Sequence, residues 1–270
     1  MRFLVAAIQM ASTPSIPTNL DESARLIAEA AHKGARLVAL PENFALMGRS
    51  DTDKVEKREK PGSGPIQDFL QDSAKKHRLW LVGGSVPLES SVPDKVRASS
   101  LLYNPQGECV ARYDKIHLFN LELGSERYLE AKTIEPGNEV VAVSTELGKM
   151  GLSICYDLRF PELFRAMGLV DMILLPSAFT AATGRAHWEV LVRARAIENQ
   201  CYVIAPAQGG FHANGRETHG HSMVVDPWGV VLASLPRGPG VVLAEIDPER
   251  IATVRRQLPA QSHRTIAKVL

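Results

Sequence analysis

The chain has 270 residues, of which 45% are hydrophobic and 23% are charged, and its formal net charge is +1. These values are typical of a soluble globular protein with a large core, and they give no electrostatic reason to expect a nucleic-acid or membrane partner. The three cysteines and an apolar run at residues 3–8, too short for a signal peptide, predict a cytoplasmic protein with free thiols.

The first forty residues predict a strand, a helix and a second strand. The strands are the apolar runs at residues 3–9 and 35–40. Between them, apolar residues recur at helical spacing, and we expect a cap at Thr18 or Asn19 and an end at Gly34. A strand–helix–strand unit of this length favours parallel pairing.

Residues 48–65 are polar and carry charges of both signs. We interpret this segment as a solvated loop or an exposed helix face, with a lid over a cleft as the alternative. An amphipathic helix is expected from residue 66, followed by a strand at 79–82. Gly83 and Gly84 then allow the backbone to turn closely.

The middle of the chain predicts antiparallel pairing. Hairpins are expected at residues 99–113 and 140–154, and a helix at 187–199 with Val190, Leu191, Ala194 and Ile197 facing inward. Further strands are expected at 172–175, 201–205, 222–225, 230–233 and 241–246, then a helix at 248–258 and a tail. Ten or more short strands are too many for one doubly wound sheet. We therefore predict a mixed α/β fold, a two-sheet sandwich with helices outside, as a single domain over residues 1–270.

The stretch 150–162 places a thiol at the end of a buried strand. Cys155 follows the strand, and Pro161 with Glu162 forms a good first turn of a helix. Such a thiol is held rigidly and can face a cleft, and a nearby helix N-terminus favours its thiolate. The alternative is a core cysteine, which is the role we expect for Cys109 and Cys201.

Two other strand ends carry reactive side chains. Glu42 follows the second strand, and Lys115 follows the first hairpin. A thiol nucleophile needs a base and a positive group for the developing oxyanion, and a buried glutamate and a lysine ammonium suit these tasks. Taken singly, Glu42 is better explained as a turn carboxylate, and Lys115 as an ordinary surface cation paired with Asp114.

Taken together, these motifs resemble those of the nitrilase superfamily of carbon–nitrogen hydrolases. The resemblance rests on Pro41-Glu42, Lys115-Ile116-His117-Leu118 and Cys155-Tyr156-Asp157-Leu158-Arg159, and extends from residue 7 to the turn at 226–229. It implies a four-layer αββα sandwich and an amidase that needs no metal or organic cofactor. It also implies a homodimer, or a higher homo-oligomer, that buries the helices bearing the nucleophile.

The resemblance also implies a role for each residue. Cys155 would be the nucleophile and Glu42 the general base, while Lys115 and the backbone N–H of Tyr156 would stabilise the tetrahedral intermediate. Residues 129–137 match the family's segment around a second glutamate, with alanine where serine is common. This match favours Glu130 over Glu126 as the residue that orients the lysine and the substrate nitrogen.

Two segments of the second half concern the substrate. Residues 186–203 and 220–229 resemble amidases that hydrolyse deaminated glutathione to 2-oxoglutarate and cysteinylglycine, whereas omega-amidases that act on 2-oxoglutaramate match less closely. The implied partner is therefore a small-molecule amide of a 2-oxo dicarboxylate. Arg159 or Arg185 could bind its carboxylate, with a structural salt bridge as the alternative for Arg159.

Three other functions are compatible with parts of the sequence. The first is a papain-like pairing of Cys155 with His117 or His187, and the second is a non-catalytic scaffold of the same fold. The third is nitrile hydrolysis, which is disfavoured because nitrile-cleaving members usually carry Cys-Trp-Glu rather than Cys-Tyr-Asp. A metal site is also not expected, since His219 and His221 have no third ligand at a supporting spacing.

Overall fold

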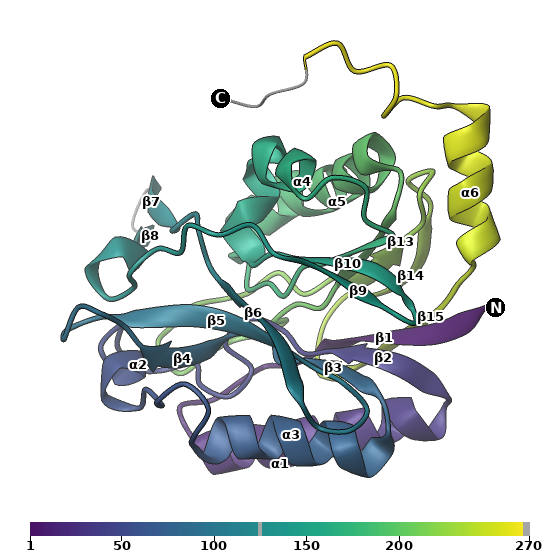
Figure 1. Cartoon of the computed structure of the whole chain (residues 1–270). Coiled ribbons are helices and arrows are strands. Elements are labelled where there is room, and N and C mark those ends of the chain that lie inside the picture. Colours follow the sequence, from purple (N-terminus) through teal and green to yellow (C-terminus); the bar gives the residue numbers. More distant parts are fainter. Residues whose placement is uncertain (124–125, 267–270) are drawn as a thin grey trace.

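Two β-sheets pack face to face, with helices on both outer sides (Figure 1). The computed structural model describes residues 1–123 and 126–266, and the side chains of residues 123, 126 and 127 are outside the described part. The first sheet contains β1 (Phe3–Gln9), β2 (Ala35–Ala39), β3 (Trp80–Val82), β4 (Val86–Glu89), β5 (Val96–Tyr103), β6 (Cys109–Asp114) and β15 (Gly240–Ile246). The second contains β9 (Ala142–Thr145), β10 (Gly148–Leu152), β11 (Met172–Leu174), β12 (Tyr202–Ala205), β13 (Ser222–Val225) and β14 (Val231–Leu235).

Each sheet has parallel strands in its middle and antiparallel strands toward its edges. Strands β1, β2 and β3 are parallel neighbours, as are β10, β11 and β12. The hairpins β5–β6 and β9–β10 add the antiparallel pairs that the turn residues predicted. The mixed α/β class and the two-sheet sandwich are therefore confirmed.

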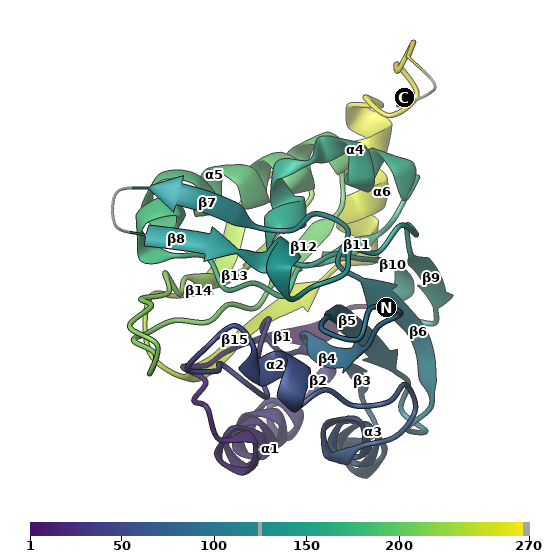
Figure 2. The same cartoon turned by 90° about the vertical axis from the view of Figure 1, so that its left-hand side faces the viewer.

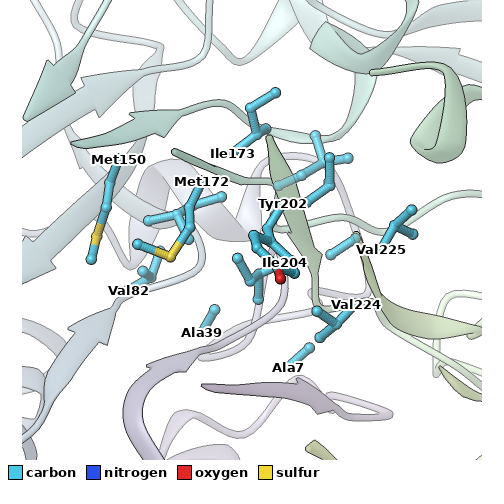
Figure 3. Packing of buried hydrophobic residues seen from close by; sticks show 14 of the residues in the cluster. Ala7, Ala39, Val82, Met150, Met172, Ile173, Tyr202, Ile204, Val224 and Val225 are labelled. Carbon is cyan, nitrogen blue, oxygen red and sulfur yellow. The ribbon is translucent and has the colours of Figure 1, made fainter. Parts of the chain in front are cut away.

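The main core lies between the two sheets. Figure 3 shows Ala7, Ala39 and Val82 of the first sheet pointing toward Met172 and other large residues of the second. At these positions, small side chains of the first sheet oppose larger ones of the second, which lets the two faces pack closely. This packing fixes the relative position of the strand ends that carry the site.

A second apolar cluster fills the space under the helices of the first sheet. Helices α1 (Ile16–His32) and α3 (Pro65–His77) lie side by side on that sheet, and α4 (Pro161–Ala166) and α5 (Ala181–Asn199) cover the other (Figure 1). Leu26 and Ile27 of α1 are fully buried against Ile8 and Val38. Helix α6 (Pro248–Gln257) follows β15 at the sandwich edge. Within the described residues, no helix has the length and apolar character needed to span a membrane.

Helix α5 differs from its prediction. It begins six residues earlier, at Ala181, and its buried side chains include Trp188, Val192 and Ala196. Val190 and Ile197, which were expected to face inward, are 67% and 48% exposed. Both sets of residues repeat at helical spacing, so this helix has two apolar faces and periodicity could not identify the inner one.

Two local predictions are also wrong. Ser15, rather than Thr18 or Asn19, caps α1, because its Oγ accepts from the backbone N–H of Thr18. Cys109 is exposed rather than part of the core, since β6 pairs only with β5 and leaves that end of the strand uncovered. The segment 48–65 is mostly exposed, as predicted, and contains the single-turn helix α2 (Asp53–Glu56), which has no buried residue. The exception in this segment is Glu59, which is buried. The Glu59 carboxylate accepts the first N–H groups of α3.

Candidate active site

Cys155 lies at a tight turn between β10 and α4. It begins the 3₁₀ helix η2 (Cys155–Arg159), and its φ of +48° is a left-handed conformation that non-glycine residues rarely adopt. Its N–H donates to the carbonyl of Pro176 (2.9 Å), and its Sγ accepts from the N–H of Ala178 (3.5 Å). The neighbouring strand end therefore holds the strained residue in place, a pattern that clusters at functional sites.

Asp157 joins this turn to the strand end that carries Lys115. Its buried carboxylate accepts from the N–H of Ile154 (2.8 Å), the hydroxyl of Tyr113 (2.7 Å) and the N–H of His117 (3.1 Å). Tyr113 and His117 lie two residues before and after Lys115. The sequence analysis gave Asp157 no role, although an Asp that accepts the first N–H of a helical turn is a common capping pattern.

Lys115 is buried between two carboxylates. Its Nζ lies 2.8 Å from Oε1 of Glu42, and 3.0 and 2.8 Å from the two carboxylate oxygens of Glu130. Burial by itself lowers the pKa of Lys115, but Glu130 and Glu42 outweigh that effect and raise the pKa above its ordinary value. The lysine therefore remains a cation in a side chain that water does not reach.

Glu130 is fixed by contacts on both of its oxygens. It opens the 3₁₀ helix η1 (Glu130–Lys132), directly after the hairpin of β7 (Asn120–Leu123) and β8 (Glu126–Leu129). One oxygen also accepts the N–H of Phe119 at 2.8 Å. Burial raises the pKa of Glu130, but Lys115 and then Lys54 reverse that effect and lower it, so the carboxylate is charged. The side chain of Glu126, the alternative, is outside the described residues.

Cys155 is a neutral thiol in the folded protein. Burial and the nearby Glu42 raise the pKa of Cys155 well above its usual range, and Lys115 opposes them only in part. The expectation that a helix N-terminus favours the thiolate is therefore wrong. A single 3₁₀ turn does not offset the desolvation of a buried sulfur beside a carboxylate. A base is needed to make this thiol nucleophilic.

A side-chain hydrogen bond and a close backbone contact fix the position of the backbone around Glu42. The carbonyl of Glu42 accepts from Nε2 of Gln208 (3.0 Å), which links the first sheet to the loop after β12. Gly84 has a φ of +51°, and a Cβ there would lie 2.1 Å from the carbonyl oxygen of Pro41. Only glycine therefore fits, and the predicted close turn at Gly84 is confirmed.

Cys155 opens into a cavity with about 200 Å³ of empty space, counting its mouth. Tyr156 and Arg159 line it, and the Arg159 guanidinium lies 5.3 Å from the ring centroid of Phe179. The remaining lining residues are Phe119, Ala178, Phe179, Thr180, Thr183 and Arg216. Arg185 is exposed on α5 and is not among them, so the structure brings Tyr156 and Arg159 to the site but not Arg185.

Known proteins share both the sequence and the fold of this chain. The sequence model of the carbon–nitrogen hydrolase family matches residues 4–256. The chain belongs to this family. It is 44% identical to "Deaminated glutathione amidase" of Synechocystis sp. over 97% of this chain and 98% of that protein. The human protein of the same name is 42% identical over 97% of this chain and covers 82% of its own length.

A solved structure confirms the architecture. Nit3 of Saccharomyces cerevisiae, described as a member of branch 10 of the nitrilase superfamily, superposes with a TM-score of 0.89 at 32% identity and covers 98% of this chain and 97% of its own. The protein is thus a hydrolytic enzyme, an amidase of the nitrilase superfamily.

In this carbon–nitrogen hydrolase, the two candidate histidines are engaged elsewhere. Nδ1 of His117 lies 2.7 Å from Asp157, and its ring stacks on Phe160 at 3.7 Å between centroids. His187 is exposed, and its Nδ1 lies 3.2 Å from Nη1 of Arg159. Among the described residues, no histidine has a recorded interaction with Cys155, whereas Glu42 has one. This arrangement argues against a papain-like pair.

Phe119 and Arg216 also line the cavity, and neither was predicted from the sequence. Arg216 lies on the loop between β12 and β13, and its guanidinium donates to the carbonyl of Ala178. No motif marked either residue. An arginine in a loop beside a cavity has no sequence periodicity, so only the folded chain shows that Arg216 lies near Cys155.

Proposed function

We propose that this amidase hydrolyses deaminated glutathione through a thioester on Cys155. The observation that carries the proposal is Lys115, which bridges Glu42 and Glu130 beside the thiol. Arg159 and Arg216 line the same cavity, and neither has a carboxylate partner among the described residues. A cavity with unpaired guanidinium groups suits a substrate that carries carboxylates.

The first half of the reaction forms the thioester. The Cys155 sulfur attacks the amide carbon while Glu42 takes the thiol proton, and a C–S bond forms. The Lys115 ammonium and the N–H of Tyr156 stabilise the oxyanion, since the second residue of a 3₁₀ turn has no acceptor within that helix. Glu42 then gives its proton to the amide nitrogen, the C–N bond breaks, and the amine leaves.

The second half regenerates the enzyme. Glu42 removes a proton from water as the water oxygen attacks the thioester carbon. The C–S bond breaks, Cys155 recovers a proton from Glu42, and the carboxylic acid is released. Glu130 orients Lys115 and the substrate nitrogen through the contacts on its two oxygens. Every proton in this scheme passes through Glu42, and no metal or organic cofactor takes part.

The second candidate is omega-amidase activity on 2-oxoglutaramate, which shares the acyl group. We favour deaminated glutathione because several relatives that match nearly the whole chain are named as amidases of that compound. The test is release of 2-oxoglutarate from each substrate, with Cys155→Ala as the inactive control. A preference of about tenfold or more in kcat/KM for deaminated glutathione, about 1.4 kcal/mol, supports the proposal. The reverse preference would make the enzyme an omega-amidase.

We also propose that the protein is a homodimer that buries α5. Val190 and Ile197 leave one apolar face of this helix exposed, and Trp228 and Val230 are 52% and 48% exposed. The turn at Gly229 lies against Ile197, since a Cβ on that glycine would lie 2.6 Å from the Ile197 side chain. Several exposed apolar side chains on one helix face and the turn beside it are typical of a protein–protein interface.

A double substitution of Val190→Asp and Ile197→Asp is expected to produce a monomer. Two carboxylates placed in an apolar interface lose their hydration without gaining hydrogen-bond or ionic partners. This desolvation cost exceeds the hydrophobic free energy that dimerisation gains by burying α5. Sedimentation equilibrium measures the change from the mass of two chains to that of one. Val110→Asp on β6, at another exposed apolar position, is the control and is expected to leave the dimer intact. A wild-type protein that sediments as a monomer would contradict the proposal.

A further inference from the structure

A second cavity adjoins the one at Cys155. It has about 550 Å³ of empty space, and it shares Phe119 and Arg216 with the first. Its other walls come from the segment that includes α2 and from the end of β8. Figure 2 shows α2 and the β7–β8 hairpin on the face turned toward the viewer, α2 on the side of the first sheet and the hairpin on the side of the second. Lys54 and Glu130 both line this second cavity.

The catalytic residues are distributed between the two cavities. Cys155 lines the first and Glu130 the second, and Lys115 interacts with both. A substrate carbonyl placed on the sulfur, with its amide nitrogen toward Glu130, therefore has its acyl group in the first cavity. The group on nitrogen then extends into the second. This division rests on the proposed thioester chemistry.

Two basic side chains, Lys54 and Arg216, line the second cavity. Lys115 forms an ion pair with Glu130, and Lys54 is close enough to lower the pKa of Glu130 as well, but no direct ion pair of Lys54 is recorded among the described residues. Among the residues that the structure describes, the buried Nε of Arg216 has no hydrogen-bond partner, and the Arg216 guanidinium lies 5.0 Å from the ring centroid of Tyr128. The opposing carboxylate is Asp51, which is exposed at the rim. A buried donor without a partner is costly unless a ligand satisfies it.

We infer that the second cavity holds the leaving amine of the substrate, and that Lys54 and Arg216 bind a carboxylate on that amine. The inference deepens the proposed function, since it names the residues that select an acidic peptide as the leaving group. In deaminated glutathione this carboxylate is that of the terminal glycine. A substrate that releases only ammonia makes no contact there, so Lys54 and Arg216 are specificity-determining residues.

The test compares deaminated glutathione with its analogue in which the glycine carboxylate is a primary carboxamide. The wild-type enzyme is expected to prefer the acid by about tenfold in kcat/KM, chiefly through KM, because a charge-assisted hydrogen bond is lost in the analogue. Lys54→Gln is expected to reduce this preference toward one. Lys57→Gln is the matched control, because Lys57 is exposed at the end of the same helix and does not line the cavity.

Three results would overturn the inference. The first is that the wild-type enzyme cleaves the acid and the carboxamide equally. This result would contradict the inference but not the proposed substrate. Lys54→Gln could slow both compounds equally and keep the preference, which would mean that Lys54 acts through Glu130 alone. A wild-type enzyme that cleaves neither compound would contradict the proposed substrate, and the inference with it.

Discussion

Glu42→Gln is expected to abolish amide hydrolysis while making the Cys155 thiol more acidic. Loss of a general base lowers kcat by about 10²–10⁴-fold, and the larger figure is expected here because Glu42 serves both halves of the reaction. The acidity changes because the Glu42 charge raises the pKa of Cys155, whereas Lys115 lowers it. Glutamine keeps the shape of the side chain and removes its negative charge. Lys115, which lowers the pKa of Cys155, is then no longer opposed by the Glu42 charge.

The rate of alkylation by iodoacetamide, followed against pH, measures this change. The pH midpoint for Cys155 is expected to fall in Glu42→Gln, so the variant reacts faster than the wild type near neutral pH. Both proteins should carry Cys109→Ala, because Cys109 is the exposed thiol and would dominate the signal. An unchanged midpoint would mean that Glu42 carries no charge beside the sulfur. Hydrolysis near the wild-type rate would exclude Glu42 as the base.

Much of the fold could be predicted from short-range patterns. The strand–helix–strand unit at the N-terminus and the β5–β6 hairpin depend on local periodicity and turn residues, and both form as expected. The orientation of α5 could not be predicted in this way. Its Val190 face and its Trp188 face have similar periodicity, and the choice between them depends on how the helix packs against the second sheet.

The candidate site also contains residues that sequence patterns could identify and residues that they could not. Glu42, Lys115 and Cys155 each follow a strand, so a motif could mark them and the sheets bring them together. Lys54 reaches the second cavity from the single-turn helix α2 and Arg216 from a loop, and nothing local distinguishes Lys54 from the other charges of its segment. The acidity of Cys155 also escaped sequence reasoning, because it depends on burial and on a carboxylate more than a hundred positions away.

The lysine that joins these groups also bears on stability. Lys115 and its two carboxylates are taken out of water together, and such a group is tolerated only while every charge has a partner. Both the reaction and the stability of the folded protein therefore depend on this cluster. A substitution at Lys115 should affect both quantities, whereas one at Cys155 should affect chiefly the chemistry.

Lys115→Met is expected to remove activity and to lower the free energy of unfolding by about 3–5 kcal/mol at neutral pH. Methionine fills a similar volume, so the cost comes from leaving the carboxylates of Glu42 and Glu130 near each other without a cation. The pKa of Glu130, which burial raises and Lys115 lowers, should then rise above its unfolded value in the folded variant. Its native state therefore binds more protons than its unfolded state, and its stability deficit should shrink as pH falls from 7 toward 5.

Urea unfolding followed by circular dichroism at several pH values measures this deficit. The triple variant with Glu42→Gln and Glu130→Gln added removes the unpaired charges, and it should recover most of the lost stability while remaining inactive. That recovery separates the electrostatic cost from a simple packing defect, which the two glutamines would not repair. A deficit below about 1 kcal/mol that does not change with pH would show that the folded protein gains little from the Lys115 charge, and that its retention serves the reaction alone.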